Sequence, residues 1–329
     1  MNRVPIVFCE RVCATSFTGI PNLRQLSGHY GEFARIAYER RADYVTTVAN
    51  GIEKEAYLSL QCTDRKIRTP EEIEAYPKKL VHEVTIQMFD AKDEKVSQAI
   101  VRRFPYACYH FTLLSSSINK AWVDFACSLK RLTYVVIRKK LDDHSVGLFQ
   151  KLVIEQKLSY LAIYEKAYEG GIINTLKSVL RQEQFKHLGI NNYNSGPWKS
   201  SLLRDILQLW SKNSQTLTGK HLIMEHNCAG GVKQLEEFIL RRPLNGCSKE
   251  ECDYIEKYYR HRVLQFRKPS CVYKYEEGEG DKRRRLYISF ECANEEERKT
   301  GQQNRPASHE GLNDLSLMRT TNSLHVLFA

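Results

Sequence analysis

The stretch LSYLAIYEKAYEGGIINTLKSVLRQEQFKHLGI, residues 158–190, begins and ends on the same pattern of apolar residues. In each copy, an apolar residue is followed three positions later by a second and five positions later by a third. The first copy is Leu158, Leu161 and Ile163, and the second is Phe185, Leu188 and Ile190. A pattern that returns after about 27 residues indicates a repeated structural unit, which cannot bury its apolar face alone.

The same pattern occurs six times in the middle of the chain. Its copies are Val81, Val84 and Ile86; Cys108, Phe111 and Leu113; Leu132, Val135 and Ile137; the two copies above; and a weaker one, Gly219, Leu222 and Met224. The last two apolar residues of each copy lie two positions apart, which is the spacing of a half-buried strand. Each copy therefore predicts a short strand.

Segments of helical character lie between these predicted strands. They are 94–103, 118–129, 142–155, 172–182, 199–210 and 232–241. In the fourth, Ile172, Leu176 and Val179 form one apolar stripe. A strand and a helix repeated at intervals of roughly 24 to 34 residues predict an α/β fold, in which parallel strands lie side by side with helices on one face.

These units resemble leucine-rich repeats over residues 81–242, about half of the chain. The resemblance implies a strand-helix solenoid, in which the side chains between the apolar positions point to an exposed sheet face. A doubly wound α/β sheet is the alternative, although no Gly-rich phosphate loop follows any predicted strand. The expected solenoid spans residues 80–246.

Tyr, His, Arg and carboxylate side chains dominate the positions expected on the exposed sheet face. This composition is typical of a protein-binding surface, although a solvated face without a partner is the alternative. The predicted target-binding residues are Glu83, Gln87, His110, Tyr134, Arg138, Tyr160, Tyr164, His187, Asn191, His221 and Glu225.

The first fifty residues do not follow the repeat and predict three short helices. Pro5 indicates the first position of a helix, where proline is favoured, and Phe8 and Val12 are expected on one face of that helix. A second apolar run contains Leu23 and Leu26. The third predicted helix contains Phe33, Ile36, Ala37 and Tyr38 and closes near Asp43.

This helix triplet with its opening Val-Pro resembles the F-box, and the whole chain resembles the divergent F-box-like proteins of nematodes. The resemblance implies docking on the Skp adaptor of a cullin ubiquitin ligase, through Val4, Pro5, Phe8, Val12, Leu23, Leu26 and Phe33. It makes the chain a substrate receptor of that ligase. The alternative is that the helices only cap the first repeat, as solenoids require.

Five parts are expected along the chain. They are an F-box-like module at 1–50, a connector at 51–79, the solenoid at 80–246, a helix and hairpin cap at 247–292, and a flexible tail at 293–329. The helix of the cap is expected at 249–262, and its hairpin strands at 271–275 and 285–290. The tail closes on an apolar segment, 324–329, for which we expect docking elsewhere on the protein.

The net charge is +11 and the pI is about 9.1, which favours contact with acidic partners. The densest basic run, 282–285, follows Glu276, Glu277, Glu279 and Asp281, so the local charges largely cancel. We therefore do not expect nucleic-acid binding. No apolar run approaches the roughly 20 residues of a membrane span, and no secretory signal opens the sequence.

The ten cysteines are scattered and read as reduced thiols, which indicates a cytoplasmic or nuclear location. Neither the Cys9 and Cys13 pair nor the Cys247 and Cys252 pair has the spacing of a zinc site, so no metal is expected. No nucleophile elbow, phosphate loop or dinucleotide fingerprint is present, so neither catalysis nor a cofactor is expected. An α/β enzyme with dispersed catalytic residues is the alternative to an interaction protein.

Overall fold

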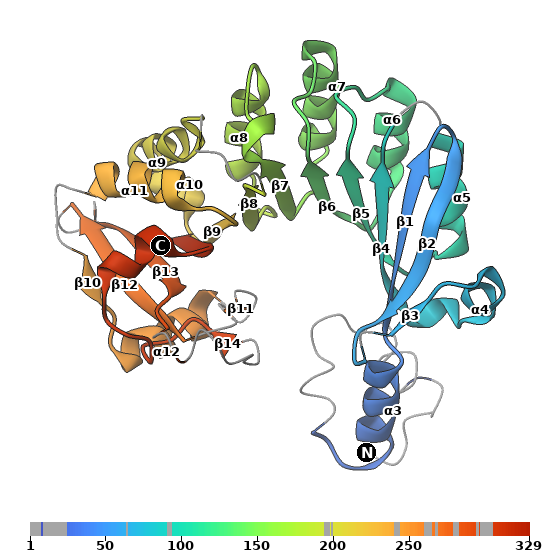
Figure 1. Cartoon of the computed structure of the whole chain (residues 1–329), viewed down its shortest axis with the longest axis horizontal. Coiled ribbons are helices and arrows are strands. Elements are labelled where there is room, and N and C mark those ends of the chain that lie inside the picture. The colour runs from blue at the N-terminus through green and yellow to red at the C-terminus, as the bar shows by residue number, and fades with distance from the viewer. Residues whose placement is uncertain are drawn as a thin grey trace. The chain divides into compact units, whose positions relative to one another are not determined.

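A computed structural model describes residue 8 and residues 25–329, apart from 64, 91–93, 194–197, 199, 240–243, 260–264, 267–268, 279–282, 294–295 and 297–304. By its internal contacts the chain divides into two units. The first unit comprises residues 1–136 and 147–157, and the second comprises 137–146 and 158–329. Figure 1 labels the helices and strands of both units.

The first unit opens with a helix and an antiparallel pair of strands before the repeated pattern begins. Its elements are α3 (Gly28–Glu39), β1 (Ala42–Ala49), β2 (Ile52–Leu60), β3 (Lys66–Ile67), α4 (Pro70–Ala75), a 3-10 turn (Lys78–Leu80), β4 (Val81–Met88), α5 (Glu94–Arg103), β5 (Cys108–Leu113) and α6 (Lys120–Ser128). Strand β6 (Leu132–Ile137) and helix α7 (Asp143–Ile154) follow. Strand β1 pairs antiparallel with β2 and parallel with β4, and β4 pairs parallel with β5.

The second unit continues the alternation of strand and helix and ends in antiparallel strands. Its elements are β7 (Tyr160–Tyr164), α8 (Ile172–Leu180), β8 (His187–Asn191), α9 (Leu202–Lys212), α10 (Ser214–Leu217), β9 (Lys220–Glu225), α11 (Ala229–Ile239), β10 (Asn245–Gly246), α12 (Lys249–Tyr259), β11 (Gln265–Phe266), β12 (Ser270–Glu277), β13 (Arg284–Glu291), β14 (Arg305–Pro306) and β15 (Ser323–Phe328). Strands β7, β8 and β9 are parallel neighbours in sequence order.

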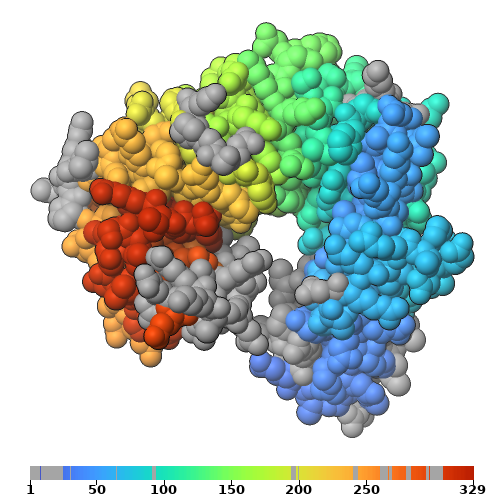
Figure 2. Space-filling model, in the orientation of Figure 1, coloured from blue at the N-terminus to red at the C-terminus, as the bar shows by residue number. Residues whose placement is uncertain are grey.

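The closing apolar segment of the chain forms β15, which lies between β9 and β13 and is antiparallel to both. Hydrogen bonds on both sides of β15 join the parallel strands to the β12–β13 hairpin. In Figure 2 the red C-terminal residues lie against the orange atoms of the preceding part of the second unit. The expected docking of 324–329 is therefore confirmed, as is the hairpin, whose two strands pair along their whole length.

Helices cover one face of the parallel strands in each unit (Figure 1). In the second unit α12 packs on the opposite face of β12, β13 and β15, where Ile255 forms a buried cluster with Val272, Tyr287 and Leu327. In the first unit, the ring of Phe111 on β5 contacts that of Trp122 on α6, with centroids 5.4 Å apart. In the second, Trp210 on α9 is fully buried and packs against Phe328 on β15 and Phe238 on α11. We call the face that carries α5 to α9 and α11 the covered face, and we call the opposite face of β1 and of β4 to β9 the uncovered face.

The six repeated segments all form strands, and a helix follows each, so the α/β alternation predicted from the pattern is confirmed. The fold built on it, a leucine-rich-repeat-like solenoid behind a three-helix module, is wrong. The described residues instead contain one mixed sheet of thirteen strands. Its antiparallel strands belong mostly to segments in which we expected helices, a connector, a cap or a flexible tail. The tail prediction is wrong for 323–328, which form β15 and pair with β9 and β13.

The correction is clearest at residues 42–49, where the third helix was expected to run to Asp43. Helix α3 ends at Glu39, and β1 follows because alternate residues can be buried: Ala42 and Tyr44 are fully buried and Val48 nearly so. The ring of Tyr44 packs on Phe104, with centroids 4.5 Å apart. An apolar set of period two is satisfied by a strand, whereas a helix would have exposed half of it.

Candidate functional site

The residues predicted to bind a target lie on the uncovered face of the strands. Strand register shows this in the second unit, where Tyr160, His187 and His221 are direct partners on β7, β8 and β9. One pleat further along, Tyr164 and Asn191 are partners in the same way, and Asn191 pairs with Glu225. In-register partners point to the same side of a sheet, so each set forms a row across the strands.

In the first unit, three predicted residues come together in one polar group. The imidazole Nδ1 of His110 lies 3.7 Å from the carboxylate Oε2 of Glu83. The ring of Tyr134 meets His110 edge-on, with centroids 5.1 Å apart. Burial lowers the pKa of His110 to about 4, although the nearby Asp43 carboxylate acts in the opposite direction. At neutral pH this histidine is therefore an uncharged hydrogen-bonding group.

Asp43 belongs to the same polar group and was missed by the sequence reasoning. It is the register partner of Glu83, and its Oδ2 accepts a hydrogen bond of 2.8 Å from the side-chain amide of Gln61. Burial, reinforced by the charge of Glu83, raises the pKa of Asp43 to about 6. The pair Asn50 and Gly51, which adopts positive φ at both positions, was the sequence signal for this hairpin.

In the second unit, aromatic rings are stacked along one row of the uncovered face. The rings of His187 and His221 are stacked with centroids 5.0 Å apart, and Tyr160 lies 5.7 Å from His187 on the other side. The Tyr160 side chain crosses over Gly189, where an added Cβ would lie 2.9 Å from the tyrosine hydroxyl. Glycine at this position therefore leaves the space in which Tyr160 is held.

A second row lies at the carboxyl ends of the strands in the same unit. The guanidinium carbon of Arg138 lies 4.7 Å from the centroid of the Tyr164 ring. On its other side Tyr164 stacks on Tyr193, with centroids 5.5 Å apart, and Tyr193 in turn lies 3.7 Å from His226. Tyr193 is 58% exposed, and the sequence reasoning missed both it and His226, because they follow the strands outside the repeated pattern.

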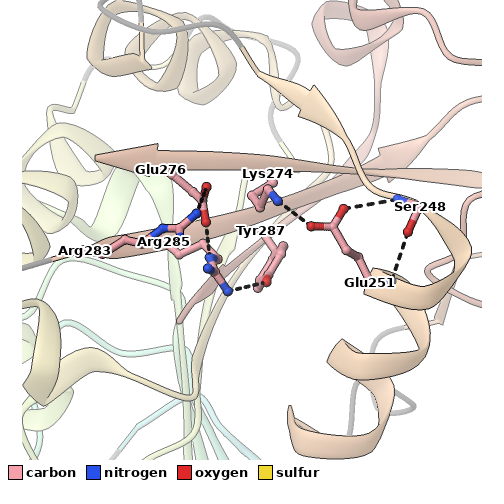
Figure 3. Close-up of polar contacts among 7 residues, drawn as sticks. All are labelled: Ser248, Glu251, Lys274, Glu276, Arg283, Arg285 and Tyr287. Atoms are coloured by element: carbon pink, nitrogen blue, oxygen red, sulfur yellow. Dashed lines mark hydrogen bonds and ion pairs between the residues drawn. The ribbon is translucent and has the colours of Figure 1, made fainter. Parts of the chain in front are cut away.

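The charged run of the hairpin forms local ion pairs, as the sequence predicted. Arg283 and Arg285 both donate to the carboxylate of Glu276, at 2.7 and 2.5 Å (Figure 3). Lys274 pairs with Glu251, and Arg284 with Glu277. These basic groups are largely neutralised by carboxylates on the neighbouring strand and helix, so they do not form a basic surface.

Glu251 also has a structural role at the start of α12. Its backbone N–H donates to the hydroxyl of Ser248, and its carboxylate accepts from the backbone N–H of Ser248 at 3.2 Å (Figure 3). This reciprocal arrangement is a capping box. The charge cluster around Lys274 therefore fixes the helix on the hairpin.

Lys220 is a buried lysine on the covered face, and no sequence pattern marks it as a candidate site residue. It is 3% exposed, and its amine donates to the carbonyl oxygens of Gln182 and Phe185, at 2.7 and 3.0 Å. Burial lowers the pKa of this amine to about 8. Both hydrogen bonds go to the loop between α8 and β8, so Lys220 ties that loop to β9.

Among the described residues, His, Cys, Asp and Glu form no metal-binding group, and Cys228, Cys247 and Cys252 are not reactive thiols. Within the described part of the chain, no group of three or more His, Cys, Asp or Glu side chains is placed to hold a metal ion. Burial raises the pKa of the Cys228 and Cys247 thiols to about 12 and that of Cys252 to about 11. A thiol with such a pKa carries almost no thiolate at neutral pH and is a poor nucleophile.

The residues predicted to bind an adaptor lie mostly outside the described residues. This applies to Val4, Pro5, Val12 and Leu23. Phe8 and Leu26 are exposed, at 54% and 43%. Phe33 packs against the buried Ala34 and Ala37 of α3.

Comparisons with known proteins found no match to a protein-family model, a curated protein or a solved structure. In the part of the chain that the structure describes, no helix combines the length and apolarity needed to cross a membrane.

Proposed function

We propose that this chain is a protein-binding protein whose uncovered sheet face receives a target. The observation that carries this proposal is the arrangement of Tyr, His, Arg and Asn side chains in rows across adjacent strands. Rings and guanidinium groups of this kind supply most of the affinity at protein interfaces. Their polar atoms give specificity, while their flat faces supply contact area.

The rings of the second unit are held in place by one another, which favours binding. The His187 ring contacts both Tyr160 and His221, and the Tyr164 ring contacts both Arg138 and Tyr193. Side chains that are already ordered lose little conformational entropy when a partner arrives. The face is therefore suited to binding without rearrangement.

The proposal includes the role implied by the resemblance of the first fifty residues to the F-box. In that role the N-terminal segment holds the Skp adaptor of a cullin ubiquitin ligase, and the uncovered face presents a target for ubiquitin transfer in the cytoplasm or nucleus. Two exposed apolar side chains near and on α3, Leu26 and Ile36, at 43% and 41%, are available for such docking. A pull-down of purified Skp adaptor tests this part, with Pro5→Ala plus Phe8→Ala expected to abolish capture.

A photocrosslinking experiment tests target binding. We would place benzoylphenylalanine at Tyr193, on the uncovered side, or at the exposed Lys233 on α11 as the matched control. We expect one defined set of proteins to crosslink at 193 and not at 233, and to be lost when His187→Ala and Tyr160→Ala are added. Identical products at both positions, or none at 193, would contradict the proposal.

A further inference from the structure

Four side chains at the carboxyl ends of the strands in the second unit form an ordered row. Tyr164, Asn191 and Glu225 end β7, β8 and β9 and are partners in the strand register. Arg138, which follows β6, lies over the Tyr164 ring at 4.7 Å. The row therefore reads cation, phenol, carboxamide and carboxylate from one end to the other.

The carboxamide in this row is buried without a hydrogen-bond partner. Asn191 is 9% exposed, and its Oδ1 accepts no hydrogen bond in the structure of the described residues. A buried polar atom without a partner has a free-energy cost, so native proteins rarely retain one without a reason. Because Oδ1 is buried, a ligand on this face reaches the two charged ends of the row and not the carboxamide oxygen.

The two charged ends of the row are also unpaired. Neither the guanidinium of Arg138 nor the carboxylate of Glu225 forms an ion pair with a described residue, and Glu225 is exposed. Both charges act on the Tyr164 phenol, whose pKa is raised mainly by burial. The neighbouring Lys140 is already paired with Glu169, at 2.9 Å. Arg138 and Glu225 therefore remain available to oppositely charged groups of a ligand.

The length of the row fixes the spacing of those ligand groups. Adjacent strands lie about 4.8 Å apart, so Tyr164 and Glu225, two strands apart, are separated by about 10 Å. Adding the distance from Tyr164 to Arg138 gives a span of about 14 Å. An extended peptide advances about 3.3 to 3.6 Å per residue, so about four residues cover this span. Side chains four residues apart also point to the same side of an extended chain.

We propose that this row binds an extended peptide segment of a partner protein in which one acidic and one basic side chain lie four residues apart. The acidic side chain pairs with Arg138 and the basic one with Glu225. The exposed ring of Tyr193 contacts the residues between the charges. This inference rests on the proposed protein-binding function and specifies its ligand.

Selection from a phage-displayed library of random dodecapeptides on the full chain tests the inference. We expect the enriched peptides to carry opposite charges four residues apart more often than the unselected library does. The affinity of one selected peptide is then measured by fluorescence polarisation. Arg138→Gln and Glu225→Gln should each weaken binding by about tenfold, as expected for a lost charge-assisted hydrogen bond. The matched control, Lys139→Gln, removes an adjacent exposed charge and should leave binding within about twofold.

A charge exchange distinguishes direct contact from a structural effect. In the double variant Arg138→Glu with Glu225→Arg, we expect loss of the selected peptide and binding of a peptide whose two charges are exchanged. Asn191→Ala should raise the melting temperature, because it removes a buried group without a partner, and should leave binding of the selected peptide within about twofold.

The outcomes separate this inference from the function on which it rests. Enriched peptides without the charge pair, or binding unchanged in both single charge variants, would overturn the inference and leave protein binding intact. No enriched peptide together with target crosslinking at position 193 would also overturn the inference alone. No enriched peptide and no crosslinking at that position would overturn both.

Discussion

The covered and uncovered faces of the same strands differ in how completely their side chains are satisfied. On β8, Leu188 and Ile190 point to the helices and are fully buried. On the opposite face of that strand, His187 and Asn191 each keep a buried polar atom without a hydrogen-bond partner in the described structure. On β8 the covered side is therefore apolar and closely packed, whereas the uncovered side keeps two buried polar atoms without a partner, each of which costs stability.

Two ionisable groups on the uncovered face are also partly desolvated. Burial shifts Asp43 and His187, both on the uncovered face, toward their neutral forms, with pKa values of about 6 and about 4. Holding such groups partly desolvated has a cost that a bound partner can offset. The comparison predicts that substitutions on the covered face destabilise the protein, whereas selected substitutions on the uncovered face stabilise it.

The largest effect is expected for Trp210→Ala on the covered face. Trp210 is fully buried among Phe238, Tyr275 and Phe328, so its removal leaves a cavity. The free energy of unfolding should fall by about 3 to 5 kcal/mol, measured by urea denaturation. The matched control is Tyr193→Ala, which removes a ring that is 58% exposed and should cost less than about 1 kcal/mol. Equal costs for the two would contradict the comparison.

Asp43→Asn should raise the free energy of unfolding at pH 7 by about 1 to 2 kcal/mol, after allowance for partial exposure. The folded pKa of about 6 lies above the ordinary value of 3.8, so this carboxyl contributes stability below pH 3.8. That contribution is lost as the pH rises through 6. Asparagine keeps the acceptor for Gln61 and removes the charge.

The pH profile provides the check on this substitution. The stability difference between Asp43→Asn and wild type should be present at pH 7 and vanish near pH 3.5, where both side chains are neutral. Unfolding followed by circular dichroism at the two pH values measures it. A gain that persists at pH 3.5 would show that the carboxylate charge is not its cause.

The pattern of apolar residues predicted the parallel strands and their helices well, because burial on one face leaves a strong periodic signal. The first strand was missed for a local reason. The third helix was expected to close near Asp43, and no strand was predicted from the alternation that begins at Ala42. The Asn50–Gly51 pair would have indicated a hairpin with a strand on each side of it, since positive φ at both positions is typical of a tight hairpin turn.

The sequence predicted which residues lie on the uncovered face only where they belong to the repeated apolar pattern. Register confirms that Tyr160, His187 and His221 form one row, as their equal positions in the repeat indicated. Asp43 and Tyr193 lie outside the repeat, and the first belongs to a strand that was not predicted. The C-terminal strands pair with partners distant in sequence, and no local pattern specifies that β15 lies between β9 and β13.

Asn191→Ala and Ile190→Ala compare the two faces within the single strand β8. Because the amide oxygen is buried without a partner, its removal should raise the free energy of unfolding by about 1 kcal/mol. The matched change on the covered face, Ile190→Ala, should lower it by about 2 to 5 kcal/mol. Opposite signs at neighbouring positions, measured in the same denaturant titration, are the expected result. A loss of stability in both variants would show that Asn191 contributes to the fold.

The smallest effect is expected for charges that are already paired. Arg283 is half-exposed, and its partner Glu276 keeps a second hydrogen bond from Arg285, so Arg283→Gln should cost less than about 0.5 kcal/mol. Arg138→Gln should change stability as little, because its guanidinium has no ion pair within the described structure. The two variants should differ in their affinity for the selected peptide. Only Arg138→Gln should lower that affinity, and added salt should reduce the affinity difference between the two variants. Similar stability with different binding would show that unpaired charge on the uncovered face is retained for a partner, whereas paired charge on the hairpin serves the fold.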